Sequence, residues 1–274
     1  MKLLFRHFIV FVLFLIFTLT TFGQVKKKQD TPLLPTAQMH TEVGAFFGIG
    51  ENIQSGIFKT DTCKCDFVDG RGFGFTIGGL YESELVRNLF WGSALAFDLK
   101  SFWSSFKERE PIDFIKDSNK YQVPVWFRYK ADASIWYMTL MPYLKYLPAK
   151  FMFLRLGLGA SFVISSKLNF TKELLDRTGR ISTGEIVNVR LDSSVSSDGI
   201  HATFINGELP KVNSTQLSLE PAIGFTFPIG EKFRFSPLFQ YSVPFANITE
   251  SGEKVKLSSW RLLLELRYDI TPEE

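Results

Sequence analysis

The segment SSWRLLLELRYDI, residues 258–270, alternates apolar with polar or charged side chains at a period of two. A β-strand turns successive side chains to opposite faces, so this segment would have one apolar face and one charged face. The apolar face would hold Trp260, Leu262, Leu264, Leu266, Tyr268 and Ile270. The other face would hold Ser259, Arg261, Leu263, Glu265, Arg267 and Asp269, with Leu263 as its one apolar member.

Seven other segments repeat this alternation, and they start near residues 42, 72, 90, 136, 152, 217 and 233. Each has roughly the 9–11 residues that a tilted strand needs to cross a membrane. No run of 18 apolar residues follows residue 24, so no internal transmembrane helix is predicted. Since only helices and closed barrels satisfy every backbone group in lipid, contact with lipid here requires a closed β-barrel.

The connections between these segments alternate between short and long. The short ones lie at about residues 82–88, 148–150 and 228–231, and the long ones at about 51–70, 102–130, 166–215 and 244–256. This alternation is typical of an outer-membrane barrel with turns in the periplasm and loops outside. The sequence therefore predicts an all-β fold, an eight-stranded antiparallel up-and-down transmembrane β-barrel with long extracellular loops.

The two faces predict which side looks outward. Water-soluble eight-stranded barrels show the same alternation but pack their apolar side chains inside. Here the face rich in Phe, Leu, Trp and Tyr is nearly free of charge, while the other face holds Gly, Ser, Thr and charged groups. We therefore expect the apolar face to contact lipid. Five aromatic residues are predicted to form girdles at the two headgroup levels: Trp91, Trp136, Tyr146, Trp260 and Tyr268.

Charged residues on the inward face would form a network in the lumen, comprising Glu42, Asp98, Lys100, Arg155, Glu220, Arg234, Arg261, Glu265 and Arg267. Because buried charges must be paired to be tolerated, we interpret them as a structural network. The alternative is a path for ions or protons. An eight-stranded barrel is just wide enough for side chains to fill, which argues against a diffusion pore.

The amino terminus predicts export. Lys2 and Arg6 precede an apolar run from Phe8 to about Phe17, and small and polar residues follow to Gly23-Gln24. This layout is that of a cleaved signal peptide, residues 1–23, with an uncleaved anchor helix as the alternative. Residues 24–39 would form a periplasmic segment, and residues 40–274 the barrel in the cell outer membrane of a Gram-negative envelope.

Charge and composition narrow the partners. Removing residues 1–23 takes away two basic residues and no acidic one, which leaves 29 basic against 28 acidic residues. A chain with so little net charge lacks the overall positive potential that attracts nucleic acid. We expect a monomer that contacts outer-membrane lipid and an extracellular or envelope protein, with no cofactor and no metal ion.

Several stretches resemble a known family. LMPYLKYLPAKFMFLRLGLGASFVI at 140–164, LSLEPAIGFTFPIG at 217–230 and FRFSPLFQYSVPF at 233–245 precede the terminal strand, and Gly23-Gln24 ends the leader. Together they resemble the PorT-like outer-membrane β-barrel family, small eight-stranded barrels similar to the membrane domain of outer-membrane protein A. The resemblance implies an integral outer-membrane protein, and some members of such families serve secretion machinery.

Cys63 and Cys65 lie in DTCKCDF within the first long connection. An exported chain meets an oxidising compartment, where thiols are usually paired. Because a Cys-x-Cys ring is small and strained, a local disulfide and an intermolecular one both remain open. A metal site would need more ligands than Asp61 and Asp66 supply nearby.

Catalysis has one candidate constellation, His201 with Ser196, Ser197 and Asp198 in the third long connection. Polar loops bring such residues close in sequence by chance, and a triad is recognised by geometry. We predict no catalytic residue. The glycines of GRGFGF and GLGLGAS lie on predicted strands, so they do not match nucleotide-binding turns.

The third long connection, about residues 166–215, is the longest. Phe170, Leu174 and Leu175 recur at helical spacing, with Thr171 and Gly179 as a start and a stop, and residues 184–206 alternate like a hairpin. It could be a binding surface or a shield over the barrel mouth. Our main hypothesis is a non-catalytic barrel for envelope structure or partner binding. The alternatives are a secretion or assembly component and a rim-located lipid- or peptide-modifying hydrolase.

Overall fold

The computed structural model describes residues 40–60, 65–116, 119–192, 194 and 196–271. The predicted signal peptide and periplasmic segment lie outside these residues, as does Cys63. Twelve strands and no helix occur in the described part of the chain: β1 Thr41–Phe58, β2 Arg71–Val86, β3 Leu89–Lys116, β4 Asn119–Ala149, β5 Met152–Leu174, β6 Thr178–Arg180, β7 Ile186–Asn188, β8 His201–Gly207, β9 Thr215–Phe225, β10 Phe227–Ile229, β11 Phe233–Pro244 and β12 Gly252–Asp269. In these residues, no helix is long and apolar enough to cross a bilayer.

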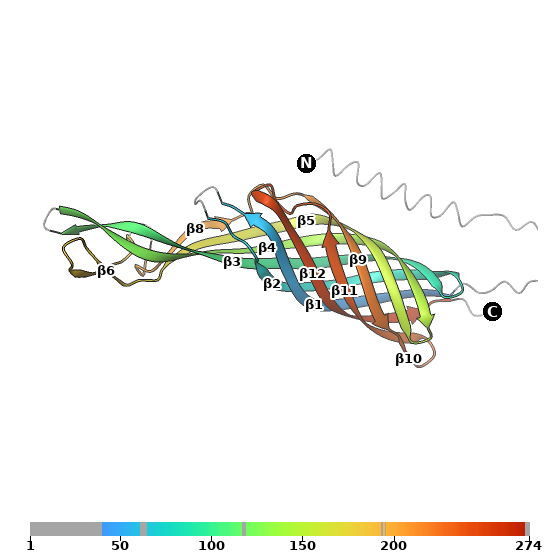
Figure 1. Ribbon diagram of the computed structural model, residues 1–274. Coiled ribbons are helices and arrows are strands. Elements are labelled where there is room, and N and C mark those ends of the chain that lie inside the picture. The colour runs from blue at the N-terminus through green and yellow to red at the C-terminus, as the bar shows by residue number, and fades with distance from the viewer. Residues whose placement is uncertain (1–39, 61–64, 117–118, 193, 195, 272–274) are drawn as a thin grey trace, which may run out of the picture. The chain divides into compact units, whose positions relative to one another are not determined.

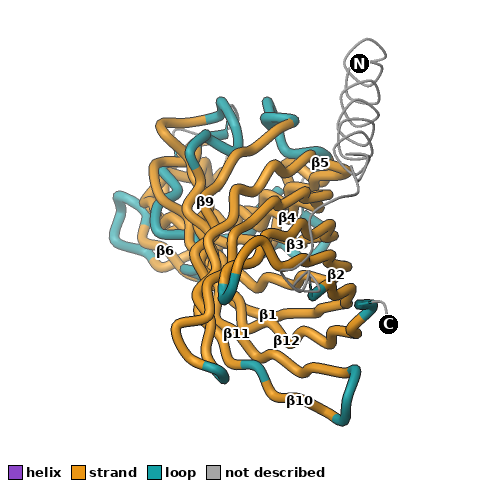
Figure 2. The backbone as a smooth tube through the Cα atoms, turned by 90° about the vertical axis from the view of Figure 1, so that its right-hand side faces the viewer, coloured by secondary structure: helices purple, strands orange, loops and turns teal. Residues whose placement is uncertain are grey.

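Eight of these strands form a ring in which each is hydrogen-bonded to two antiparallel neighbours. The order is β1, β2, β3, β4, β5, β9, β11 and β12, and β12 pairs with β1 along almost its whole length. The tilted strands run around a common axis in Figures 1 and 2. The predicted eight-stranded antiparallel up-and-down barrel is confirmed.

Alternation sorts the side chains as the sequence predicts. On β12, Leu262, Leu264 and Leu266 are exposed on the outer surface, while Arg261, Glu265 and Arg267 are buried inside. Leu263, the apolar member of the inward face, is 2% exposed. It belongs to a lumenal apolar cluster of ten buried residues that includes Phe46 and Phe153, so the lumen is less polar than the sequence suggested.

Tight turns close one end of the barrel, which we call the turn end. Only Arg87 and Asn88 separate β2 from β3, and Asn88 has a φ of 67°. Asparagine tolerates this left-handed conformation, which suits two-residue hairpin turns. The predicted turn at 82–88 is therefore too wide, because the two strands remain paired as far as Val86 and Leu89.

Beyond the opposite end, the loop end, the strands continue where long loops were expected. Every residue of β3 from Leu89 to Lys116 has a partner on β4, so the predicted loop at 102–130 is wrong and forms a hairpin. We call the part made by residues 102–135 and 166–174, with β8, the extension. Figure 1 shows β3, β4, β5 and β8 running out from the barrel into it.

Two further predictions for the third connection are wrong. The segment with helical spacing is strand: Phe170 and Leu174 belong to β5 and pair with Ala131 and Phe127 of β4. The predicted hairpin at 184–206 does not form, because β7 pairs with β6 while β8 pairs with β5. The spacing of Leu168, Phe170 and Leu174 fits a strand as well as a helix. Pairing with the edge of β4 selects the strand.

Candidate functional site

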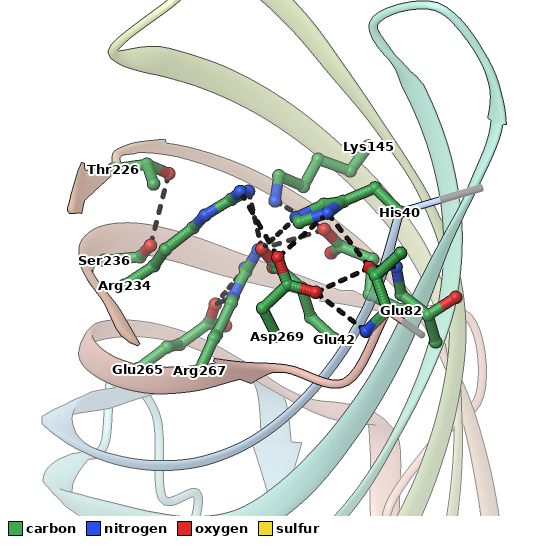
Figure 3. A network of polar contacts seen from close by, with 12 residues as sticks. His40, Glu42, Glu82, Lys145, Thr226, Arg234, Ser236, Glu265, Arg267 and Asp269 are labelled. Carbon is green, nitrogen blue, oxygen red and sulfur yellow. Dashed lines mark hydrogen bonds and ion pairs between the residues drawn. The ribbon is translucent and has the colours of Figure 1, made fainter. Parts of the chain in front are cut away.

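Charged side chains fill the turn end of the lumen (Figure 3). Arg267 is completely buried and contacts three carboxylates: Glu265, Glu82 at 3.1 Å and Glu42 at 3.5 Å. Its guanidinium also lies over the ring of Phe153 at 5.5 Å. Arg267 is therefore the hub of what we call the turn-end network: His40, Glu42, Glu82, Lys145, Arg155, Arg234, Glu265, Arg267 and Asp269.

Each of the three carboxylates also contacts a second cation, which for Glu42 is Arg234. Lys145 Nζ lies 2.6 Å from Glu82, and Arg155 Nη1 lies 2.5 Å from Glu265. These groups come from β2, β4, β5 and β12, so the contacts cross the barrel interior. Multiple partners for each buried charge are what makes burial of charge tolerable.

The same network reaches the rim at the turn end. Arg234, a third exposed, lies 2.6 Å from Glu42 and 4.0 Å from Asp269. His40 bridges Glu42 at 2.9 Å and Asp269 at 3.1 Å through its two ring nitrogens. The first and last strands of the ring are thus joined by side chains as well as by backbone.

A second group of polar side chains lies farther along the lumen. Arg261 donates to Asn52 at 2.8 Å and lies 3.3 Å from Asp98, whose other oxygen lies 3.7 Å from Lys100. The guanidinium lies over Gly74, where an added Cβ would come within 2.2 Å of Arg261 Cζ. Glycine at this position therefore makes room for the arginine.

Hydrogen bonds extend the turn-end network along the lumen to Glu220. Arg155 donates to Gln240 Oε1 at 2.7 Å, and Gln240 donates to Glu220 at 2.9 Å. Glu220 also accepts hydrogen bonds from Ser218 and Ser242. All nine charged residues that the sequence placed inward are on the lumen side, with Arg234 at the rim.

Three charged members of the networks were missed by sequence reasoning. Glu82 was assigned to a turn, while Lys145 and Asp269 were placed on inward faces but left out of the network. The nine predicted residues carry five positive and four negative charges; the three additions bring both totals to six. The missing signal was charge balance, because a buried network with unequal charges leaves one group uncompensated.

Little free space remains between these side chains. One lumenal cavity of about 40 Å³ is lined by residues that include Asp98, Glu220 and Arg261. A site needs about 10–15 Å³ of such volume for each water, so this cavity holds a few waters at most. No volume of this size can serve as an open channel.

An apolar core lies beyond the charged lumen, toward the loop end. Its buried members come from the extension and from the other long connections, including Phe67, Phe102, Phe170, Ile248 and Leu257. Phe170 contacts the rings of Phe67 and Tyr129, with centroids 5.8 and 6.0 Å apart. The long connections thus share one folded core, which we call the cap core.

Cys65 is fully buried in the cap core and is disulfide-bonded. Its predicted partner Cys63 lies outside the described residues, so the identity of the pair stays a prediction. No group of three or more metal-ligating side chains occurs in the described part of the chain.

Asp198 organises the candidate catalytic cluster. One carboxylate oxygen lies 2.7 Å from His201 Nδ1, and the other accepts hydrogen bonds from Ser196 Oγ at 2.9 Å and from the backbone N–H of His201 at 2.8 Å. These bonds, led by the one from His201, hold the pKa of Asp198 well below its ordinary value. Ser196 donates to the carboxylate rather than to His201, so these three side chains meet at Asp198 and do not form a chain of hydrogen bonds from serine through histidine to aspartate.

The outer surface of the barrel is apolar, and all five predicted girdle residues lie on it. Trp260 and Tyr268 are eight positions apart on β12, and Trp136 and Tyr146 are ten apart on β4. At about 3.3 Å per residue and a tilt of roughly 40°, these separations span about 20–25 Å. That height matches the apolar band of a membrane barrel, about 25 Å.

Comparisons with known proteins give no family assignment. No protein-family model matches the chain, and no curated protein matches its sequence. Among solved structures, Ail, the attachment invasion locus protein of Yersinia pestis, is 14% identical, with 83% of this chain and 98% of that chain covered at a TM-score of 0.34. Neisserial surface protein A is 9% identical, with 84% and 97% covered at 0.34. The outer membrane protease OmpT of Escherichia coli is 9% identical, with 88% and 100% covered at 0.33.

Proposed function

We propose that this protein is a non-catalytic, integral outer-membrane β-barrel that holds its long connections, folded around the cap core, at the cell surface for contact with a partner. We call these connections the cap. The observation that carries the proposal is the cap core. Connections that could have been independent loops instead share a set of buried aromatic and aliphatic side chains. Such a core fixes the position of the surface above it, which favours specific binding over simple shielding of the barrel.

The lumen supports an anchoring role for the barrel. Six positive and six negative side chains line the lumen and its rim together with the lumenal apolar cluster, and the cavity among them measures about 40 Å³. A transporter or porin needs a continuous water-filled path, and the cap core lies over one end of this lumen. The charged network is thus best explained as the packing of a closed anchor.

The unequal ends support one orientation. In outer-membrane barrels the short turns lie in the periplasm and the long connections outside. The turn end offers only short connections, such as Arg87-Asn88 and Lys150-Phe151. The cap and extension would therefore face the exterior, where a partner could reach them.

The hydrogen bonds around Asp198 support a non-catalytic role for the candidate cluster. The carboxylate accepts bonds from Ser196 and from the backbone of Ile200 and His201, so it closes a loop at the entrance to β8. Removing His201 would then change loop order rather than a turnover rate.

Barrel formation and orientation can be tested together in cells. We would insert an epitope after Lys116, at the tip of the β3–β4 hairpin, or after Arg87, in the turn between β2 and β3. Antibody should label intact cells for the first insertion and only permeabilised cells for the second. Both proteins should migrate differently on gels before and after heating, as closed membrane barrels do.

The opposite labelling pattern would refute the orientation. Loss of the heat-dependent shift in the unmodified protein, with the chain in the soluble fraction, would refute the membrane barrel itself. A binding role for the cap predicts that the Lys116 insertion lowers attachment of the cells to their partner surface while the barrel remains folded.

A further inference from the structure

The outward face of the extension carries an excess of positive charge. It continues the lipid-facing surface of the barrel without a break, because β3 and β4 keep one register from Leu89 to Lys116. On the outward positions of the paired rows between Ser101 and Arg109 there are five cations and two carboxylates. The cations are Lys107, Arg109, Arg128, Lys130 and Lys167, and the carboxylates are Asp132 and Glu173.

Neutralisation within this surface, which we call the basic face, is incomplete. Glu173 is shared, with Lys130 at 2.7 Å and Arg128 at 3.3 Å. The hydrogen bond from Lys130 holds the pKa of Glu173 below its ordinary value, so this carboxylate is charged at neutral pH. Asp176 adds a third carboxylate at the far edge, where it accepts a hydrogen bond from the backbone N–H of Trp126. The basic face still keeps a net positive charge of two.

Two of the cations stand directly opposite each other. Lys107 and Arg128 are cross-strand partners, an arrangement that destabilises a sheet when both charges have the same sign. Neither Lys107 nor Arg109 has a carboxylate within ion-pair distance among the described residues. Trp126, directly opposite Arg109, is 45% exposed on the same face. A surface that keeps repelling cations beside an exposed tryptophan is suited to an anionic ligand.

The height of these cations limits what the ligand can be. Arg128 lies eight positions beyond Trp136, the residue at the upper edge of the apolar band. At about 3.3 Å per residue and a tilt of roughly 40°, Arg128 stands about 20 Å above that edge, and Arg109 stands higher. A phospholipid headgroup layer is only about 5–8 Å deep. It would reach Lys167, which is two rows above Trp136, but not the cations farther out.

We infer that the basic face binds the phosphate-bearing saccharide headgroups of glycolipids in the outer leaflet that surrounds the barrel. The inference rests on the orientation proposed above. Only an anionic headgroup several sugars deep spans the distance from Lys167 to Arg109. The occupant is membrane-borne because the basic face rises laterally from the lipid-facing belt on the same strands.

The test uses the full chain in nanodiscs of three compositions: phospholipid alone, phospholipid with a glycolipid that carries a phosphorylated core saccharide, and phospholipid with the same glycolipid lacking the core. The variant K107Q/R109Q/K130Q removes three cations of the basic face. The matched control R177Q/R180Q/R190Q removes three exposed cations near β6 and β7. The measured quantity is the temperature at which the heat-dependent gel shift occurs.

We expect the core glycolipid to raise this temperature for the wild-type chain and the control variant, and the rise to disappear in K107Q/R109Q/K130Q. The rise should also fall in 1 M salt, which screens charges over about 3 Å. An equal rise with the core-less glycolipid, or a rise retained by K107Q/R109Q/K130Q, would overturn the inference. So would binding of a soluble sulfated polysaccharide that competes fully with the glycolipid.

Failure of the proposed function would look different. A chain that does not insert into any nanodisc, or shows no heat-dependent shift in phospholipid alone, would contradict the membrane barrel. The phospholipid sample also serves as the folding control for both triple variants, whose substituted side chains are all exposed.

Discussion

Replacing Arg267 by methionine should strongly destabilise the barrel. Arg267 is fully buried and contacts Glu42, Glu82 and Glu265, so its loss leaves the turn-end network with four carboxylates and three cations besides His40. Breaking a buried ion network from one side costs about 3–5 kcal/mol, because a charge remains without compensation. We expect a decrease of that size in the free energy of unfolding.

Arg234 offers a matched control. It is directly opposite Arg267 in the β11–β12 register, but its side chain is 33% exposed, and its partner Glu42 keeps His40 and Arg267 nearby. The R234M substitution should therefore cost about 1 kcal/mol or less. In the double variant R267M/E265Q the charges balance again, so it should be more stable than R267M alone.

The assay is reversible denaturant unfolding of the full chain in lipid vesicles, followed by tryptophan fluorescence and by the heat-dependent gel shift. The reasoning is refuted if R267M and R234M lose the same stability. It is also refuted if the double variant is less stable than R267M, since restored charge balance would then bring no benefit.

Three other predictions test separate parts of the molecule. F170A, which removes a fully buried ring from the cap core, should cost about 3–5 kcal/mol, measured as faster proteolysis of the extension; an unchanged rate would mean the core does not hold it. G74A should cost about 1–3 kcal/mol in denaturant unfolding, because the new Cβ must displace the Arg261 guanidinium; a neutral result would show that the arginine moves freely. The lowered pKa of Asp198 means that its stabilisation is present above the unfolded pKa of about 3.9 and is lost as pH falls through the lower folded value. The protection factor of the His201 amide, which is its exchange rate compared with that of an unstructured amide at the same pH, should therefore stay high down to about pH 4 and fall below it, and D198N should show low protection throughout; a fall already at pH 6 would point to a different group.

The barrel itself was predictable because the two faces of each strand meet different environments. Leu262 and Leu264 must contact an apolar medium while Arg261 and Glu265 must not, and each predicted membrane-crossing strand therefore alternates apolar and polar residues with a period of two. The inward charges could be assigned for the same reason. The burial of Glu82 was not predicted, because charged residues near a turn are common. Only the pairing of β2 with β3 shows that β2 continues far enough to bury this side chain.

The extension could not be predicted in the same way. Above the membrane band the outer face meets water, so Arg128 and Lys130 face outward and the inward positions become apolar, as at Phe127 and Tyr129. Partway along β4, the apolar residues thus change from the outward face to the inward face. The pattern of apolar outward residues that identifies a membrane strand therefore ends at that point. Phe170 fitted a helical spacing equally well, and only tertiary pairing with β4 selected the strand.

The unbroken pairing of β3 with β4 has a mechanical consequence. In the orientation proposed above, a partner pulling on the tip of the extension would load the strands along their length, so many backbone hydrogen bonds would resist in shear at once instead of opening one after another. The ladder passes from the extension into the bilayer without a linker, and the tension reaches the barrel wall directly. Under such a load, the contact between the barrel and the surrounding lipid would give way before any connection within the protein.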